Sequence, residues 1–184
     1  LSNAAPLSAK SPGMTRILNR VGGARALSAI LLAAAMLAAL SIGWTGFIAS
    51  DDSLYFVAAE HWLNNPPFAG DNHWATRFPL LWSFAAMIAL LGRGFAAFAA
   101  TAVLWYVVMI VIVGRFAMRV GGERTGWIAA ILTATLPVVI SNATTVSVDL
   151  LETSMLLPGA LALGEAARAP EGLLRGLLAG LCVG

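Results

Sequence analysis

The sequence predicts an all-α fold, namely a polytopic membrane protein built from a bundle of transmembrane helices. Of the 184 residues, 59% are hydrophobic and only 11% are charged. Soluble domains carry about 25% charged residues, so this chain lacks the polar surface that water would require. Long uncharged runs recur, and the first of them (26–49) is long enough to cross a hydrocarbon core of ~30 Å.

The net charge of +2 does not indicate nucleic-acid binding. The basic residues stand in short groups beside the apolar runs, as topology signals do. The single Cys182 provides neither a disulfide framework nor a cysteine metal cluster. We therefore expect the lipid bilayer as a partner, and no nucleic acid.

The basic residues near the N-terminus set the orientation of the first span. They are Lys10, Arg16, Arg20 and Arg25. By the positive-inside rule, residues 1–25 form a cytoplasmic N-terminal segment and residues 26–184 form the transmembrane domain. Asp51 then emerges on the outer side.

Residues 50–93 are predicted to form an outer loop that contains two short helices. Asp52 or Ser53 caps the first helix, which runs to about Leu63. The following Pro66 and Pro67 end it, because proline removes a backbone donor and restricts the residue before it. The second helix, 78–91, is apolar but shorter than the ~20 residues that a span requires, so we expect it to lie in or dip into the outer interface.

The arginines decide whether 78–91 spans the membrane. If it does not, every arginine after Arg93 lies in the cytoplasm; if it does, those arginines lie outside. The positive-inside rule favours the first arrangement. The remaining spans are then predicted at 94–114, 126–142 and 150–166.

A further apolar stretch, 172–184, stops after roughly half the length of a span. We therefore expect the chain to be the N-terminal part of a longer protein, and the isolated chain to be inactive. The Ala-, Leu- and Gly-rich composition is typical of a bacterium with GC-rich DNA, which predicts a multi-pass protein of the inner membrane.

This topology gathers acidic residues at the outer face, where each has two interpretations. Asp52 is placed to cap a helix, which leaves the adjacent Asp51 unexplained. Asp149 and Glu152 share one helix face. They either begin the helix as solvated acids that favour its dipole, or line a polar cavity as functional groups.

The outer loop also carries two histidines and a strong cation. His61 and His73, each followed by Trp, would bind zinc only together with Asp51 or Asp71, and their spacing matches no zinc pattern. We therefore assign no metal site, with a divalent ion as the alternative. Arg77 either binds phosphate through its guanidinium or anchors the interfacial helix.

These motifs resemble membrane glycosyltransferases of the GT-C fold, such as the protein O-mannosyltransferases and the bacterial aminoarabinose transferases. Asp51-Asp52-Ser53-Leu54-Tyr55 is similar to the acidic pair that opens a juxtamembrane helix in the first outer loop of that family. Arg77-Phe78-Pro79 is similar to its basic residue–proline element, with one residue inserted. Asp149 resembles the acid at the outer start of a later helix.

The resemblance implies an inverting transfer of a sugar from a polyprenyl-phosphate donor to a glycan, lipid or protein acceptor at the periplasmic face, without a cofactor. It implies Asp51 as general base and Asp149 as a second catalytic carboxylate, which positions the acceptor or supports Asp51. The substrate-binding residues would be Asp52, Tyr55, His73, Arg77 and Glu152. The alternative is an ion-coupled transporter that uses Asp149 and Glu152, although transporters place such acids near the membrane midplane.

Overall fold

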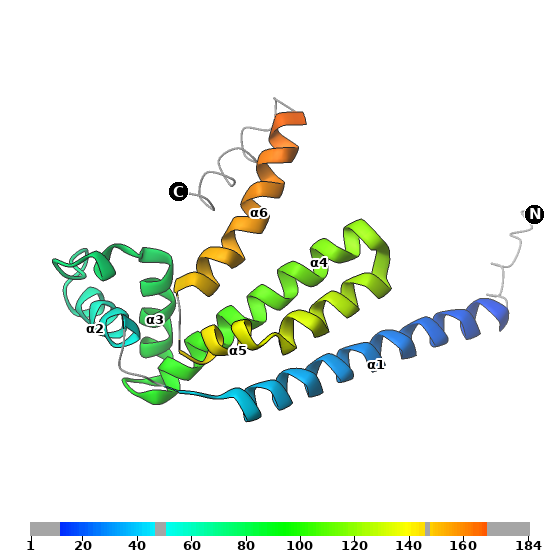
Figure 1. Ribbon diagram of the computed structural model, residues 1–184, viewed down its shortest axis with the longest axis horizontal. Coiled ribbons are helices and arrows are strands. Elements are labelled where there is room, and N and C mark those ends of the chain that lie inside the picture. Colours follow the sequence, from blue (N-terminus) through cyan, green and yellow to red (C-terminus); the bar gives the residue numbers. More distant parts are fainter. Residues whose placement is uncertain (1–11, 47–50, 146–147, 169–184) are drawn as a thin grey trace, which may run out of the picture.

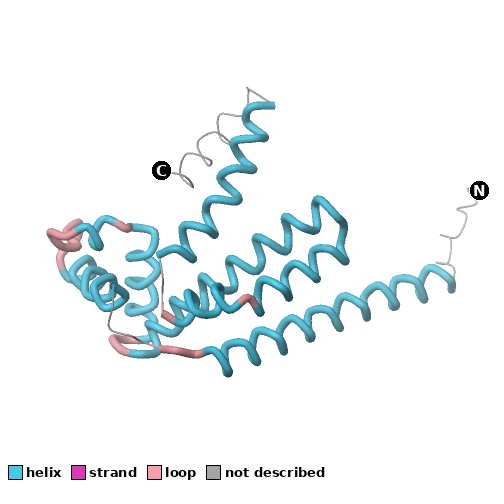
Figure 2. Tube along the Cα trace, in the orientation of Figure 1, coloured by secondary structure: helices cyan, strands magenta, loops and turns pink. Residues whose placement is uncertain are grey.

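The computed structural model describes residues 12–46, 51–145 and 148–168, and within these ranges all regular structure is helical (Figures 1 and 2). The all-α prediction is therefore confirmed for this part of the chain. The elements in order are α1 (Pro12–Gly43), α2 (Asp51–Asn64), the 3-10 turn η1 (His73–Thr76), α3 (Phe78–Leu91), α4 (Phe95–Thr135), α5 (Pro137–Thr144) and α6 (Val148–Arg168).

Two helices are long and apolar enough to cross a membrane, namely Gly22–Gly43 within α1 and Phe95–Thr135. The pair α5 and α6, bent by 119°, makes a third candidate if the two helices form one span. No residue of the apolar part of α1 is fully buried against the described chain. Such a surface requires lipid or other helices to cover it, so length and composition mark the chain as a membrane protein.

Helix α4 is a hairpin of two antiparallel limbs. Its backbone leaves the helical conformation at Gly122, where φ is 82°, and Figure 1 shows the chain reversing there. The Tyr106 hydroxyl donates a hydrogen bond of 2.6 Å to the Ala134 carbonyl oxygen. In one straight helix these residues would stand about 42 Å apart at 1.5 Å per residue. The first limb, 95–121, contains nearly all of the predicted span 94–114. The second limb, 123–135, contains only the first part of the predicted span 126–142, because the helix is interrupted at Leu136 and the rest falls in α5.

Small residues allow the two limbs to approach closely. A Cβ atom added at Gly126 would lie 2.8 Å from the Gly114 carbonyl oxygen, and one added at Gly114 would lie 3.2 Å from the Cβ of Ala130. Side chains larger than hydrogen at Gly126 would force the backbones apart, so glycine is required at this crossing.

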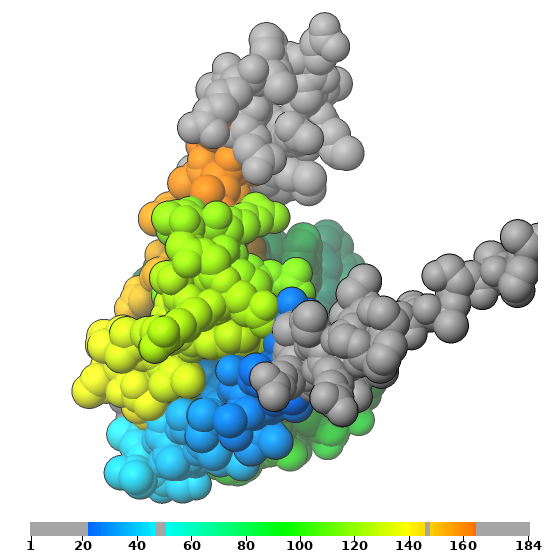
Figure 3. Space-filling view, turned by 90° about the vertical axis from the view of Figure 1, so that its right-hand side faces the viewer, coloured from blue at the N-terminus to red at the C-terminus, as the bar shows by residue number. Residues whose placement is uncertain are grey.

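Polar contacts join α1 to the turn of this hairpin, and join the segment after α1 to α5. Arg25 makes a two-pronged ion pair with Glu123 at the hairpin turn, at 2.7 and 3.0 Å. At the opposite end the hydroxyls of Thr45 and Thr144 lie 2.7 Å apart. Figure 3 shows α1 lying against the second limb and α5. The helix ends at Gly43, earlier than the predicted 26–49, and residues 47–50 and 172–184 lie outside the described residues.

Helices α2 and α3 pack on each other and on the start of α4. Leu81 and Phe84 are fully buried in this cluster, and Arg93 pairs with Glu60 at 3.2 Å. The bounds of α3 match the predicted 78–91, and it is too short to count as a span. It crosses the direction of α1 instead of running parallel to it (Figure 1). Such an arrangement suits a helix lying along one end of a bundle.

Candidate functional site

The predicted site residues gather around Tyr55, near the start of α2. Tyr55 is 2% exposed and belongs to the core cluster formed by α2, α3 and the start of α4. The charged groups close enough to act on its hydroxyl are Arg77, Asp51, Glu152 and Asp149. Residues 51–77 and the start of α6, which are far apart in sequence, therefore meet at one place.

An ion pair joins these two segments directly. The Arg77 Nη1 atom lies 3.2 Å from the Glu152 Oε1 atom, and both side chains are partly exposed. Arg77 occupies the N-cap position of α3, and its side chain caps nothing there. The 3-10 turn before it is fixed by Asn72, whose side chain accepts a hydrogen bond from the Ala75 amide. The guanidinium is thus held at a loop position from which it reaches α6.

The surroundings of Tyr55 favour its protonated form. Burial raises the pKa of its hydroxyl above the ordinary value, the Arg77 charge opposes this, and Asp51, Glu152 and Asp149 raise the pKa further. At neutral pH the hydroxyl therefore remains a hydrogen-bond donor in the middle of a group of acids.

The two adjacent aspartates have opposite environments. Asp51 is exposed, whereas Asp52 is 3% exposed. The predicted cap at Asp52 or Ser53 is wrong, because α2 begins at Asp51 and both residues lie within its first turn. The Asp52 Oδ1 atom accepts a hydrogen bond of 2.9 Å from the Ser53 amide, and its buried Oδ2 atom has no hydrogen-bond partner within the described residues. A buried carboxylate oxygen normally has a partner, so a ligand or another segment is expected to supply one.

The acids of α6 lie at its start. Asp149 is exposed in the first turn, and Glu152 is exposed one turn further along the helix. The sharp bend between α5 and α6 brings this end of α6 toward α2 and α3. Neither acid is in the middle of a helix.

The two histidines lie apart from this group. His73 is exposed, its ring is 3.8 Å from that of Trp74, and it is not among the groups that act on Tyr55. His61 lines a separate hollow of about 380 Å³ together with Asp71. Within the described ranges, no three His, Cys, Asp or Glu side chains gather closely enough to hold a metal ion.

Two features of the site did not follow from the sequence. An apolar groove of about 420 Å³ begins at Ser53, beside Asp52, and is lined by Phe56, Phe95 and Phe98. The recurrence of phenylalanine at 95 and 98 was its only sequence signal. The indole N–H of Trp74 is buried without a partner within the described residues, and no sequence pattern marks it.

The chain was compared with known proteins. No known protein family, no curated protein and no solved structure matches it.

Proposed function

We propose that this protein is an inverting membrane glycosyltransferase of the GT-C type, which transfers a sugar from a polyprenyl-phosphate donor to an acceptor. The observation that carries the proposal is the meeting of two distant segments, joined by Arg77 and Glu152, around the buried Tyr55. It places a cation that suits phosphate beside carboxylates that suit proton transfer. The resemblance of the sequence motifs to that family supports the same reaction.

Asp51 is the proposed general base. Because it is exposed, an acceptor arriving from solution reaches it without displacing the core. As the acceptor oxygen attacks the anomeric carbon, its proton passes to the Asp51 carboxylate and the bond from that carbon to the phosphate oxygen breaks. Attack from the face opposite the leaving group inverts the anomeric configuration.

Arg77 is proposed to hold the leaving phosphate and to offset its developing charge. Its contact with Glu152 is partly exposed and therefore weak, so a phosphate is able to replace it. The protonated hydroxyl of Tyr55 supplies a further donor, and Asp149 positions the acceptor.

Asp52 and the neighbouring groove are proposed to hold the rest of the donor. The unpartnered Oδ2 atom of Asp52 would accept a hydrogen bond from a sugar hydroxyl. The apolar groove beside Ser53 would take the first isoprene units of the lipid. His73 lies on the edge of this region, and its substrate contact stays a prediction.

The proposed setting is a bacterial inner membrane, with several spans and the site on the periplasmic side. The support is the distribution of charge along α4. Its turn carries Arg119 and Arg124, whereas the opposite end lies near the acidic group. The positive-inside rule then places the hairpin turn and the N-terminus in the cytoplasm.

The test uses single substitutions in the chromosomal gene, so that the protein is assayed as the cell makes it. Membrane extracts of wild type and of the Asp51→Asn, Asp52→Asn and Asp149→Asn variants receive radiolabelled polyprenyl-phosphate sugars, and donor consumption is measured. We expect Asp51→Asn to lower turnover by about 10²–10⁴-fold, the usual contribution of a general base. Asp71→Asn is the matched control, since Asp71 is an exposed acid of the same loop that lines the separate hollow.

Unchanged turnover in Asp51→Asn would remove the base from this mechanism. If Asp52→Asn alone abolished turnover, the buried aspartate would take that role. Failure of wild type to consume any lipid-linked sugar would contradict the proposed function, and ion uptake by the Asp149→Asn and Glu152→Gln variants would then be measured for the transporter alternative.

A further inference from the structure

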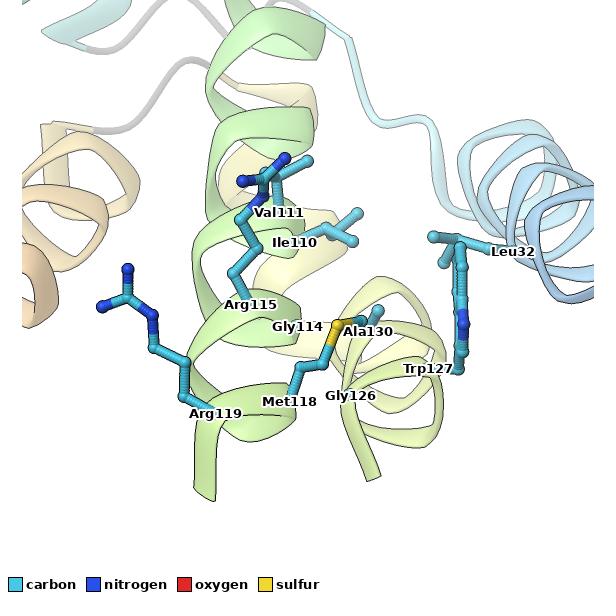
Figure 4. A pocket seen from close by; sticks show the side chains of 10 residues that line it. All are labelled: Leu32, Ile110, Val111, Gly114, Arg115, Met118, Arg119, Gly126, Trp127 and Ala130. Carbon is cyan, nitrogen blue, oxygen red and sulfur yellow. The ribbon is translucent and has the colours of Figure 1, made fainter. Parts of the chain in front are cut away.

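A second hollow lies near the turn of the α4 hairpin, far from the acidic group. It has a volume of about 650 Å³ and lies between α1 and the two limbs of α4 (Figure 4). Its lining is mostly apolar, with Leu32 on α1, Ile110 on the first limb and Trp127 on the second. Two arginines, Arg115 and Arg119, complete it.

The depth of this hollow follows from the residues around it. The ion pair of Arg25 with Glu123 stands beside the hairpin turn and marks the level at which charges are solvated. At 1.5 Å per residue, Arg119 and Arg115 lie about 4–5 Å and about 10 Å along the helix from Gly122. Both guanidiniums extend away from the turn, as Figure 4 shows, and therefore toward the apolar part of the helix.

Arg115 and Arg119 are both exposed, and neither takes part in an ion pair with another described side chain. The ion pairs of the described side chains join Arg25 to Glu123, Arg77 to Glu152 and Arg93 to Glu60. Glu123, the acid at this end of the hairpin, is already held by Arg25 through two contacts. A charged side chain at membrane depth without a partner is costly, and such a side chain commonly marks a binding site.

Trp127 belongs to the apolar wall of the same hollow, and its buried indole N–H is directed at the Glu123 carboxylate. The hollow thus presents two guanidiniums beside an apolar wall. A ligand that matches both parts of this hollow must combine a negatively charged hydrogen-bond acceptor with a hydrocarbon part.

We propose that this hollow binds one anionic glycerophospholipid from the leaflet on the Arg25 side. Arg115 and Arg119 are one helical turn apart, a spacing at which both reach a single phosphate. An acyl chain would lie along Leu32, Ile110 and Trp127. Basic pockets between transmembrane helices are known to bind anionic head groups, and the apolar wall favours a lipid over a soluble phosphate.

The alternative is that both arginines simply extend to the membrane surface as topology signals. Under that alternative, lipid binding depends on the total positive charge at this end of the hairpin. Under the proposal, it depends on whether an arginine lines the hollow. Arg124 separates the two cases, because it stands at the same turn and does not line the hollow.

The experiment measures lipid retention by native mass spectrometry on the purified protein in a mild detergent. Phosphatidylglycerol and phosphatidylcholine with identical acyl chains are titrated separately. We expect wild type to prefer phosphatidylglycerol. Arg115→Gln should lower that affinity by about fivefold and the double variant with Arg119→Gln by about 25-fold. Arg124→Gln should change it less than twofold, and Arg115→Lys, which keeps the charge, should retain most of it.

Four outcomes would overturn the proposal. Equal affinity for the two lipids would show that charge plays no part. An equal loss in Arg124→Gln and Arg115→Gln would assign the effect to diffuse charge, and an equal loss in Arg115→Lys and Arg115→Gln would exclude phosphate recognition. Displacement of phosphatidylglycerol by an equal concentration of glycerol phosphate would identify a soluble ligand instead. Circular dichroism of each variant checks that the helices are retained.

Discussion

The substitution Gly126→Ala tests the hairpin on which the arrangement of α4 depends. The new Cβ atom would stand 2.7 Å from the Cβ of Met118 and 2.8 Å from the carbonyl oxygen of Gly114. Neither atom is the far end of a flexible side chain, so the two limbs must move apart. Overpacking of this kind costs about 1–3 kcal/mol. Alanine regains about 0.8–1 kcal/mol of helix propensity over glycine, which leaves a net loss of roughly 0–2 kcal/mol.

Thermal unfolding in detergent, followed by circular dichroism at the helix band, measures this loss. A change of 1 kcal/mol shifts the midpoint by about 2–4 °C in a chain of this size, so we expect a fall of up to about 8 °C. Gly164→Ala is the matched control, because no described atom outside its own stretch of helix lies within 4 Å of a Cβ at that position. That variant should gain about 0.5–1 kcal/mol. If Gly126→Ala stabilised the chain as much as Gly164→Ala, the limbs would not be packed and α4 would not be a hairpin.

Three further predictions address single contacts. Tyr106→Phe removes the hydrogen bond to the Ala134 carbonyl and should lower the free energy of unfolding in a denaturant titration by about 1 kcal/mol, whereas no change would contradict that contact. In a double-mutant cycle at low salt, Arg77→Gln and Glu152→Gln should couple by about 0.2–1 kcal/mol, since the pair is partly exposed; additive effects would argue against the pair. The pKa of Tyr55 is raised in the folded chain, so its contribution to stability is complete below about pH 10 and is lost as the pH rises through the folded value. Tyr55→Phe should therefore flatten the fall in thermal stability above pH 10, and an unchanged slope would show that Tyr55 is not the group responsible.

The helix boundaries were predictable where the chain carries a local signal. The bounds of α3 match the predicted 78–91, because Pro79 stands in its first turn and Gly92, at a φ of 80°, follows its last residue. The end of α1 was not predictable, because the uncharged run continues beyond Gly43 and hydropathy does not record where the hydrogen-bonding pattern stops. The break at Leu136 was missed although Pro137 follows it, because the predicted span was drawn from hydropathy alone.

The composition of the site was more predictable than its orientation. Charge distribution alone placed Asp51, Arg77, Asp149 and Glu152 on one side, and the structure brings these four around Tyr55. Which of two adjacent aspartates faces inward depends on the rotation of α2 about its axis, since neighbouring helical residues point about 100° apart. The buried residues Asp52, Tyr55 and Ala59 recur at helical spacing, so the periodicity of the sequence indicates that Asp52, and not Asp51, faces inward.

The arginines near the hairpin turn enter two proposals, orientation in the membrane and lipid binding, and the same variants distinguish them. Orientation depends on the number of positive charges on one side, so Arg124→Gln should weaken it as much as Arg115→Gln. Lipid binding depends on the position of the charge, so Arg115→Gln should weaken it and Arg124→Gln should not, because of these two only Arg115 lines the hollow. Accessibility labelling of a cysteine introduced between α2 and α3 measures orientation, and native mass spectrometry measures binding. If Arg115→Gln loses lipid but keeps its orientation in the membrane, Arg115 does more than mark the cytoplasmic side. A topology signal alone gives no reason for an arginine to line the wall of a hollow.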